Sequence, residues 1–408
     1  MATSLPMRWI LAVAMLILLG VAYVVVQLVR PVPAVATSAS AYSKASIPGT
    51  PSPLSWPAQG QAAFGVEGVG LLDTQGAQTP TPLASVTKLM TAYVVLHDHP
   101  LTKTASGPDI PIGSADVTTF LQDRAAGDSV VDVAPGEQLS ERQALEALLI
   151  PSGDNIATLL ADWDAGSETA FVAKMNAAAK QLGLSGTTYT DASGVAPGSE
   201  STAESQVKLA MRDMTNPAFR AIVDMPQATL PVAGLQYNID ALLGHDGVIG
   251  VKTGFTTSAG GCFVFAATTT IAGKPATVVG AVLHQFATAT QPSALTQAFD
   301  AATALLTSAD RELVQRTVVH KGEVLGHLDA PWSGSVALKA MRSVTLTGIP
   351  GQRVTTTVVL PDKVAAPVPS GHHFGTAVVV VGHQRVSVPL QTASPLPSAP
   401  LSWKLTNI

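Results

Sequence analysis

The sequence ASVTKLMTAY occupies residues 84–93 and places Ser85 three positions before Lys88. Apolar residues recur at helical spacing from Leu83 to Leu96, which predicts a helix that begins near Ser85. Residues three apart lie on one face of a helix, so Lys88 should project beside Ser85. A serine hydroxyl needs an adjacent base to take its proton, and Lys88 can serve if burial and a second nearby cation keep it neutral.

The Ser-x-x-Lys pattern indicates a catalytic site only in combination with two further clusters. The pattern Ser-x-x-Lys recurs at residues 205–208, and an isolated copy is more simply a helix cap followed by a solvated lysine. Downstream of the first copy, however, stand Ser152-Gly153-Asp154 and Lys252-Thr253-Gly254. The three clusters are far apart along the chain, so they can meet only in a folded domain.

The two downstream clusters can support a serine nucleophile. Ser152 lies in a short connection between two predicted helices, where a rigidly held hydroxyl can relay a proton; capping the second helix is its simpler role. Lys252 follows an apolar run typical of a strand, and at a strand edge it can hold a carboxylate. Thr253 can donate a hydrogen bond there, and Gly254 lets a substrate backbone approach closely.

Five segments, in this order, carry a resemblance to a known family: ASVTKLMTAY at 84–93, PGE at 135–137, LLIPSGDN at 148–155, DASG at 191–194 and KTG at 252–254. Over roughly residues 56–306 the chain resembles the low-molecular-mass penicillin-binding proteins, the serine D-Ala-D-Ala carboxypeptidases. The resemblance implies an α+β fold with a β-lactamase/transpeptidase-like domain, in which helices flank an antiparallel sheet.

The same resemblance implies a reaction. These enzymes cleave the terminal D-alanine from peptidoglycan stem peptides through an acyl-serine intermediate, and β-lactams inhibit them covalently; neither a metal nor a cofactor is implied. By position, Ser85 resembles the acylated nucleophile, Lys88 its proton acceptor and Ser152 the proton relay. Lys252 resembles the family's second lysine, which lies near the first one and helps to bind the substrate's terminal carboxylate.

The resemblance also implies a set of substrate-binding residues. Thr253 would bind the terminal carboxylate together with Lys252, and Gly254 would lie along the substrate backbone. The backbone N–H groups of Ser85 and Phe255 would form the oxyanion hole, in which a single donor is typically worth roughly 10²–10³ in rate.

One position departs from the family pattern. The second cluster usually ends in asparagine, whereas this chain has Asp154 followed by Asn155, and we expect both to contribute to substrate binding. A carboxylate favours the charged form of both lysines, leaves less neutral Lys88 at neutral pH and predicts an alkaline-shifted rate profile. Two other interpretations stay open: a one-residue slip that lets Asn155 fill the pocket, and Asp154 as a helix cap only.

The composition argues against nucleic-acid binding, and the N-terminus indicates where the protein is located. Only 12% of the 408 residues are charged and the net charge is −5, so the composition does not suggest a basic surface for nucleic acid. Trp9 to Val26 form an uncharged apolar run long enough to span a membrane, although residues 34–36 (AVA) offer a signal-peptide cleavage site. We predict an uncleaved anchor, with the remaining chain at the extracytoplasmic face of the bacterial membrane.

The sequence divides into four expected segments. Residues 1–30 form a cytoplasmic tip and the membrane segment, and the Pro/Ser/Ala-rich residues 31–61 form an extended linker. Residues 62–308 form the catalytic domain, and short alternating runs within 312–408 predict a small all-β C-terminal domain. The resembled family often ends in an amphipathic membrane helix, but residues 395–408 contain three prolines and show no helical stripe, so we expect the N-terminal segment to do the anchoring.

Two other functions remain possible from the sequence. A β-lactamase shares the three clusters, but we find no Glu-x-x-Leu-Asn pattern for a deacylating glutamate. A catalytically weak cell-wall binding protein is the second alternative, because Asp154 and the added β domain depart from a simple enzyme.

Overall fold

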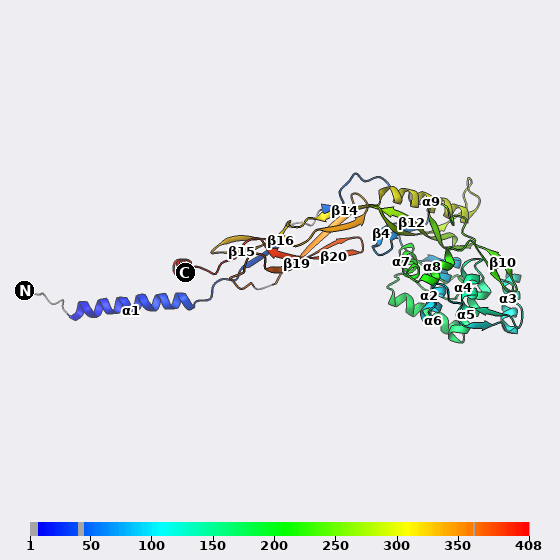
Figure 1. The fold of residues 1–408 in the computed structure, drawn as a ribbon, viewed down its shortest axis with the longest axis horizontal. Helices are drawn as coiled ribbons and strands as arrows, with labels where there is room; N and C mark the ends of the chain where they lie inside the picture. The colour runs from blue at the N-terminus through cyan, green and yellow to red at the C-terminus, as the bar shows by residue number, and fades with distance from the viewer. Residues whose placement is uncertain (1–6, 40–44, 362–363, 408) are drawn as a thin grey trace, which may run out of the picture.

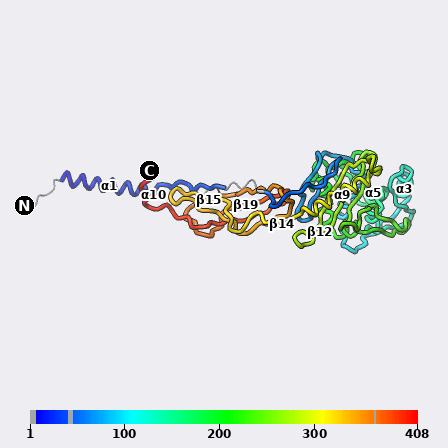
Figure 2. Tube along the Cα trace, turned by 90° about the horizontal axis from the view of Figure 1, so that it is seen from above, coloured from blue at the N-terminus to red at the C-terminus, as the bar shows by residue number. Residues whose placement is uncertain are grey.

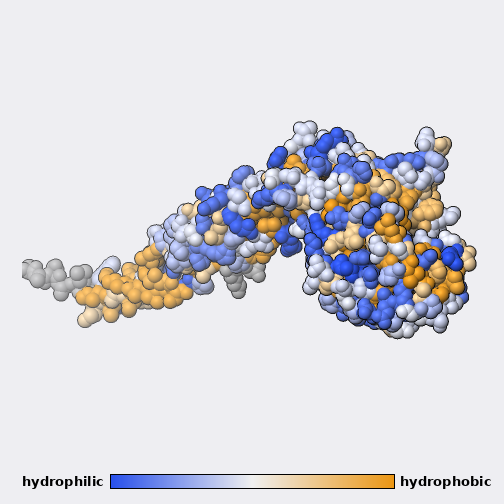
Figure 3. Space-filling view, turned by 45° about the vertical axis from the view of Figure 1, so that its right-hand side comes forward, coloured by the Kyte–Doolittle hydropathy of each residue, from blue (hydrophilic) through white to orange (hydrophobic). Residues whose placement is uncertain are grey.

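The computed structural model describes residues 7–39, 45–361 and 364–407. They form an elongated molecule with helix α1 (Met7–Val29) at one end, a β-rich part in the middle, and a mixed helical and β part at the other end (Figures 1 and 2). Within the described ranges, α1 is the one helix long and apolar enough to cross a membrane. Apart from the buried Gln27, its side chains are exposed, and Figure 3 shows an apolar band that ends where the β-rich part begins.

The mixed part is built on an antiparallel sheet. Its strands lie in the order β11 (Val248–Thr256), β12 (Gly260–Ile271), β13 (Lys274–Gln285), β3 (Gln61–Val66) and β4 (Gly70–Gln75). Both faces are covered, because α9 (Ala294–Glu312) packs on one side and α7 (Ala203–Met214) on the other. Alternate residues of β12 therefore enter different core clusters. Strand β11 lies at the edge, so one side of the Lys252 strand has no neighbouring strand among the described residues.

A group of helices extends the core on the α7 side of this sheet. It comprises η1 (Ala84–Thr87), α2 (Lys88–Asp98), α3 (Ser114–Ala126), α4 (Glu141–Leu149), α5 (Asp154–Ala165), α6 (Glu168–Gln181) and α8 (Pro217–Val223). Three two-stranded ribbons join these helices: β5 (Thr81–Pro82) with β8 (Glu200–Ser201), β6 (Asp109–Pro111) with β7 (Gln138–Ser140), and β9 (Gln227–Leu230) with β10 (Gly234–Tyr237). The predicted helical spacing after Leu83 is present, but residues 84–87 form a 3₁₀ turn and the α-helix begins at Lys88.

The C-terminal part is all β, as predicted, apart from a short last helix. Its main sheet has the strand order β1 (Ala36–Ala39), β15 (Val324–Ala330), β16 (Gly334–Ala340), β20 (Gln384–Thr392), β19 (His373–Val381), β18 (Arg353–Val359) and β2 (Ala45–Ser46). A separate pair joins β14 (Val314–Val319) to β17 (Val344–Gly348). The α+β class of the chain is therefore confirmed, while the exact segment boundaries stay predictions.

Two features of the chain ends do not follow from the sequence pattern. The expected linker is not a free stalk, since β1 pairs with β15 and β2 pairs with β18, which makes linker strands the two edges of the C-terminal sheet. Backbone groups of an edge strand need partners, and this extended, nearly uncharged segment supplies them. In addition, the short helix α10 (Leu401–Thr406) forms in a segment whose sequence shows no helical stripe, and it packs against α1.

Candidate active site

Ser85 and Lys88 meet within one turn of backbone. Ser85 lies in the 3₁₀ turn η1, in which side chains three residues apart eclipse one another. The distance from Lys88 Nζ to Ser85 Oγ is 2.9 Å. Lys88 is fully buried, so the predicted nucleophile has an amine in direct contact and largely shielded from water.

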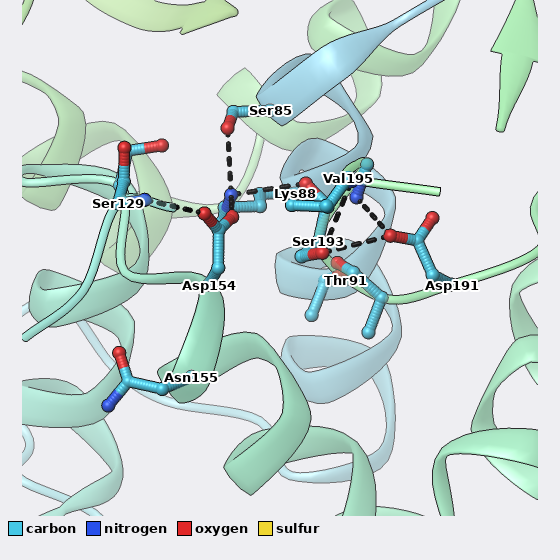
Figure 4. A network of polar contacts seen from close by, with 12 residues as sticks. Ser85, Lys88, Thr91, Ser129, Asp154, Asn155, Asp191, Ser193 and Val195 are labelled. Atoms are coloured by element: carbon cyan, nitrogen blue, oxygen red, sulfur yellow. Dashed lines mark hydrogen bonds and ion pairs between the residues drawn. The ribbon is translucent and has the colours of Figure 1, made fainter. Parts of the chain in front are cut away.

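The Lys88 amine has three oxygen neighbours in this structure (Figure 4). Besides Ser85 Oγ, it contacts Asp154 Oδ1 at 2.5 Å and the carbonyl oxygen of Ser193 at 3.1 Å. An ammonium group can donate to all three oxygens. A neutral amine can donate to Asp154 and Ser193 and accept the Ser85 hydroxyl proton with its lone pair. The same geometry therefore suits both charge states, and the proton on Lys88 decides whether Ser85 can be activated.

Asp154 occupies the position expected from the second cluster. It is 5% exposed, and while Oδ1 pairs with Lys88, Oδ2 accepts a hydrogen bond from the backbone N–H of Ser129 at 2.9 Å. Asp154 is thus committed to the site and caps no amide of its own helix α5, so the interpretation of a helix cap only is wrong.

Asn155 lies away from Lys88 (Figure 4). Its side-chain oxygen accepts from the N–H of Val131 at 2.9 Å, and its side-chain nitrogen donates to the carbonyl oxygen of Val131 at 2.9 Å. The oxygen and the nitrogen of the Asn155 amide are therefore both bonded to the backbone of Val131, in the segment before α4. The alternative in which a one-residue slip lets Asn155 fill the pocket is therefore wrong, and we no longer expect Asn155 to bind substrate.

Ser152 and Lys252 form a second serine and lysine pair. Ser152 lies between α4 and α5 in the left-handed region, with φ of 68°, which aims a non-glycine side chain in an unusual direction. Lys252 Nζ donates to Ser152 Oγ at 2.9 Å and to the carbonyl oxygen of Thr253 at 3.1 Å. The structure thus brings the second and third clusters into direct contact.

Burial controls the charge of Lys252. Its side chain is almost fully buried, and desolvation, followed by repulsion from Lys88, lowers the pKa of Lys252 to about 7. Asp154 and Asp240 act in the opposite direction. Asp240, at 6% exposure, was not predicted as part of the site, because no motif marks it and only the fold places it near Lys252.

The loop before β8 supplies a group that the sequence did not predict. The carbonyl oxygen of Ser193 accepts from Lys88, and the carboxylate of Asp191 fixes this loop by accepting from the Ser193 hydroxyl and the Gly194 N–H. Thr91 of α2 also donates to the carbonyl oxygen of Ala192 at 2.6 Å. The segment DASG was recognised only as part of the family pattern, since a backbone carbonyl leaves no signature in a sequence.

Gly254 lies against the backbone that carries Ser85. A Cβ atom at this position would lie 2.8 Å from the carbonyl oxygen of Leu83 and 3.1 Å from the backbone nitrogen of Ser85. Glycine is therefore required by the packing of β11 on η1, a different reason from the approach of a substrate backbone. Next to it, the side chain of Thr253 is buried and that of Phe255 is exposed. Their roles in substrate binding stay predictions.

Comparison with known proteins matches this geometry to a family. The sequence profile of the D-alanyl-D-alanine carboxypeptidase family matches residues 67–284, a range that contains all three clusters. The chain is 35% identical to a D-alanyl-D-alanine carboxypeptidase from Streptomyces sp. over 236 residues, which cover 52% of this chain and 75% of that protein. It is 37% identical to one from Mycobacterium tuberculosis over 193 residues, with coverage of 46% and 62%.

Solved structures of related proteins share the fold of this chain. A DD-transpeptidase from Streptomyces superposes with a TM-score of 0.54 at 28% identity, covering 64% of this chain and 98% of that one. Penicillin binding protein 5 from Haemophilus influenzae shares the fold, with a TM-score of 0.60 at 22% identity, covering 86% of this chain and 100% of that one. On the evidence of its profile match, its sequence relatives and its fold, the chain belongs to the D-alanyl-D-alanine carboxypeptidase family.

Proposed function

We propose that this chain removes the terminal D-alanine from peptidoglycan stem pentapeptides through an acyl intermediate on Ser85. The observation that carries the proposal is the 2.9 Å contact between Ser85 Oγ and Lys88 Nζ in a buried site that also holds Lys252. The family and the names of its relatives favour a serine carboxypeptidase over a β-lactamase or a silent binding protein. Peptidoglycan peptides are then the substrates, and β-lactams are covalent ligands of the same serine.

Acylation can follow from the contacts in the site. Neutral Lys88 takes the proton of the Ser85 hydroxyl while Ser85 Oγ bonds to the carbonyl carbon before the terminal D-alanine. When the carbon–nitrogen bond breaks, the leaving amine takes a proton from Ser152, which Lys252 replaces across their 2.9 Å contact. Water then attacks the acyl carbon and passes its proton through Ser152 back to Lys252, while protonated Lys88 returns its proton to the departing Ser85 Oγ, which releases the acyl group and restores Ser85.

The developing oxyanion and the terminal carboxylate need separate partners. The N–H groups of Ser85 and Phe255 are our candidates for the oxyanion, and the close packing of Gly254 on η1 supports this by holding the two backbones together. Lys252 and Thr253 are our candidates for the carboxylate. A bound carboxylate stabilises the charged form of Lys252, whose pKa without ligand is already lowered to about 7.

We also propose that α1 is retained as a membrane anchor and that the catalytic part works outside the cytoplasm. Cleavage after residue 36 would remove Val35, which is 3% exposed in the core of the C-terminal domain. It would also remove Ala36, which pairs with Asp329 at the start of β1. A signal peptide is normally dispensable to the fold, whereas this segment is built into it.

Ser85→Ala tests the reaction. We expect release of D-alanine from a stem pentapeptide to fall at least about a thousandfold and labelling by fluorescent penicillin to disappear, because the acylated oxygen is gone. Ser205→Ala, in the second Ser-x-x-Lys pattern, is the matched control and should keep both signals, since its hydroxyl only donates to the carbonyl oxygen of Ser185. Penicillin labelling that persists in Ser85→Ala would contradict the proposal.

Asp154→Asn tests the charge state of Lys88. The substitution keeps an oxygen for the Ser129 N–H but removes the negative charge, so Lys88 should lose its proton at lower pH. We expect the pH dependence of the acylation rate to shift to lower pH by about one unit or more. At pH values below the midpoint of the profile, the rate should therefore rise roughly tenfold. Stopped-flow acylation by a chromogenic β-lactam across a pH series measures this shift.

The control for that shift is Asp123→Asn. Asp123 lies near enough to be repelled by Asp154, and within the described part of the chain it forms no hydrogen bond or ion pair with either lysine. Its substitution should leave the profile in place. If Asp154→Asn has the same pH dependence as the unsubstituted protein, the ion pair does not govern activation.

Gly254→Ala tests the packing of β11 on η1. The new methyl group would push on the backbone that carries Ser85, so we expect acylation to fall by roughly a hundredfold or more. The free energy of unfolding should fall by about 1–3 kcal/mol from overpacking. Gly113→Ala is the control, since its Cβ would reach only an Asp116 oxygen at 3.5 Å. Full acylation by a stably folded Gly254→Ala would show that this contact is unimportant.

The mass of the protein purified from a producing bacterium tests whether α1 is retained. We expect the chain extracted from membranes of a producing bacterium to have an intact mass that includes residues 7–36. Deletion of residues 1–36 should lower the thermal stability of the C-terminal domain, because Val35 leaves a cavity in its core. A natural N-terminus at residue 37 would refute the anchor while leaving the carboxypeptidase reaction untouched.

A further inference from the structure

Helix α10 packs against the C-terminal end of α1, and a cavity that is partly open to solvent lies between them. Tyr23 Oη of α1 donates to the carbonyl oxygen of Leu405 at 3.0 Å, and the Arg30 guanidinium donates to the carbonyl oxygen of Asn407 at 3.4 Å. The views in Figures 1 and 2 place the C-terminus beside this end of α1. The cavity between them measures about 240 Å³, and its lining includes Arg30 and Lys404.

The charges in this cavity favour an anion. Arg30 and Lys404 line it, and no acidic side chain does among the described residues. Gln27 also lines the cavity; it is 6% exposed, and its Oε1 has no hydrogen-bond partner within the described part of the chain. A buried amide oxygen without a partner costs free energy, so a ligand here should carry a hydrogen-bond donor as well as negative charge.

The position of the cavity identifies the source of such a ligand. The sequence from Trp9 to Val29 carries no charge, and Arg30 is the first charged residue after it, so the cavity lies at the level where a bilayer's headgroups would surround α1. Trp403 lines the cavity, and its ring lies 5.8 Å from that of Trp332. Tryptophan and tyrosine are enriched at this depth of a membrane.

We propose that the seam between α1 and α10 binds the headgroup of one anionic phospholipid, of the phosphatidylglycerol class. The phosphate accepts hydrogen bonds from Arg30 and Lys404, and a glycerol hydroxyl donates to Gln27 Oε1. Phosphatidylcholine suits the site less, since its headgroup has no net charge and no donor. This inference rests on the proposed anchoring of α1.

Native mass spectrometry of the full chain in detergent, titrated with phosphatidylglycerol or phosphatidylcholine, tests the site. We expect phosphatidylglycerol to bind at least about tenfold more tightly. The Arg30→Gln, Lys404→Gln double variant should lose this preference, and Gln27→Leu should weaken it severalfold. Arg385→Gln is the control, because Arg385 is an exposed cation on the β19–β20 hairpin and does not line the cavity.

The outcomes separate this inference from the proposed function. Acylation of Ser85 by penicillin should be unchanged in every variant, which reports that the catalytic part is folded. Equal affinity for the two lipids, or a preference that survives in the double variant, overturns the lipid site even if α1 is retained. A preference lost equally in Arg385→Gln would show that the effect comes from net charge, and it would overturn the site as well.

Discussion

The ion pair between Lys88 and Asp154 is the interaction on which the site depends. Two lysines are buried in one cleft, and moving an ammonium group out of water costs several kcal/mol unless a partner compensates. Lys88 has that partner at 2.5 Å, whereas Lys252 contacts only neutral oxygens, and burial lowers its pKa to about 7. The cleft therefore holds one lysine paired with a carboxylate and one lysine whose hydrogen bonds go to neutral oxygens, which differs from a site with asparagine at position 154.

The backbone arrangement that creates this pair is held from two sides. On one side, a Cβ atom at Gly254 would press on the carbonyl oxygen of Leu83. On the other side, a Cβ atom at Gly194 would lie 1.9 Å from the carbonyl oxygen of Ala84. Both contacts fall on η1, so the turn carrying Ser85 is clamped between strand β11 and the loop before β8. Close approach at two glycines fixes the nucleophile more firmly than side-chain packing could, because backbone atoms cannot change rotamer.

The sequence predicted the parts of the site that depend on local spacing. The contact between Ser85 and Lys88 follows from a separation of three residues, and the position of Ser152 follows from two flanking helical patterns. The Ser193 carbonyl and Asp240 could not be predicted, because only tertiary packing brings them near the lysines. The linker strands were missed for a similar reason, since an extended uncharged segment does not reveal whether another strand lies beside it.

The pairing of the linker also changes how the cleft is positioned. A free linker would let the catalytic part sample many heights above a membrane, because its end-to-end distance fluctuates. Here both edges of the C-terminal sheet come from the linker, and Gln352 of that domain donates to the carbonyl oxygen of Leu72 in β4 at 2.7 Å. The β domain therefore lies as a folded unit between α1 and the catalytic sheet (Figure 1). On our proposal that α1 stays in the membrane, the β domain would hold Ser85 away from the bilayer.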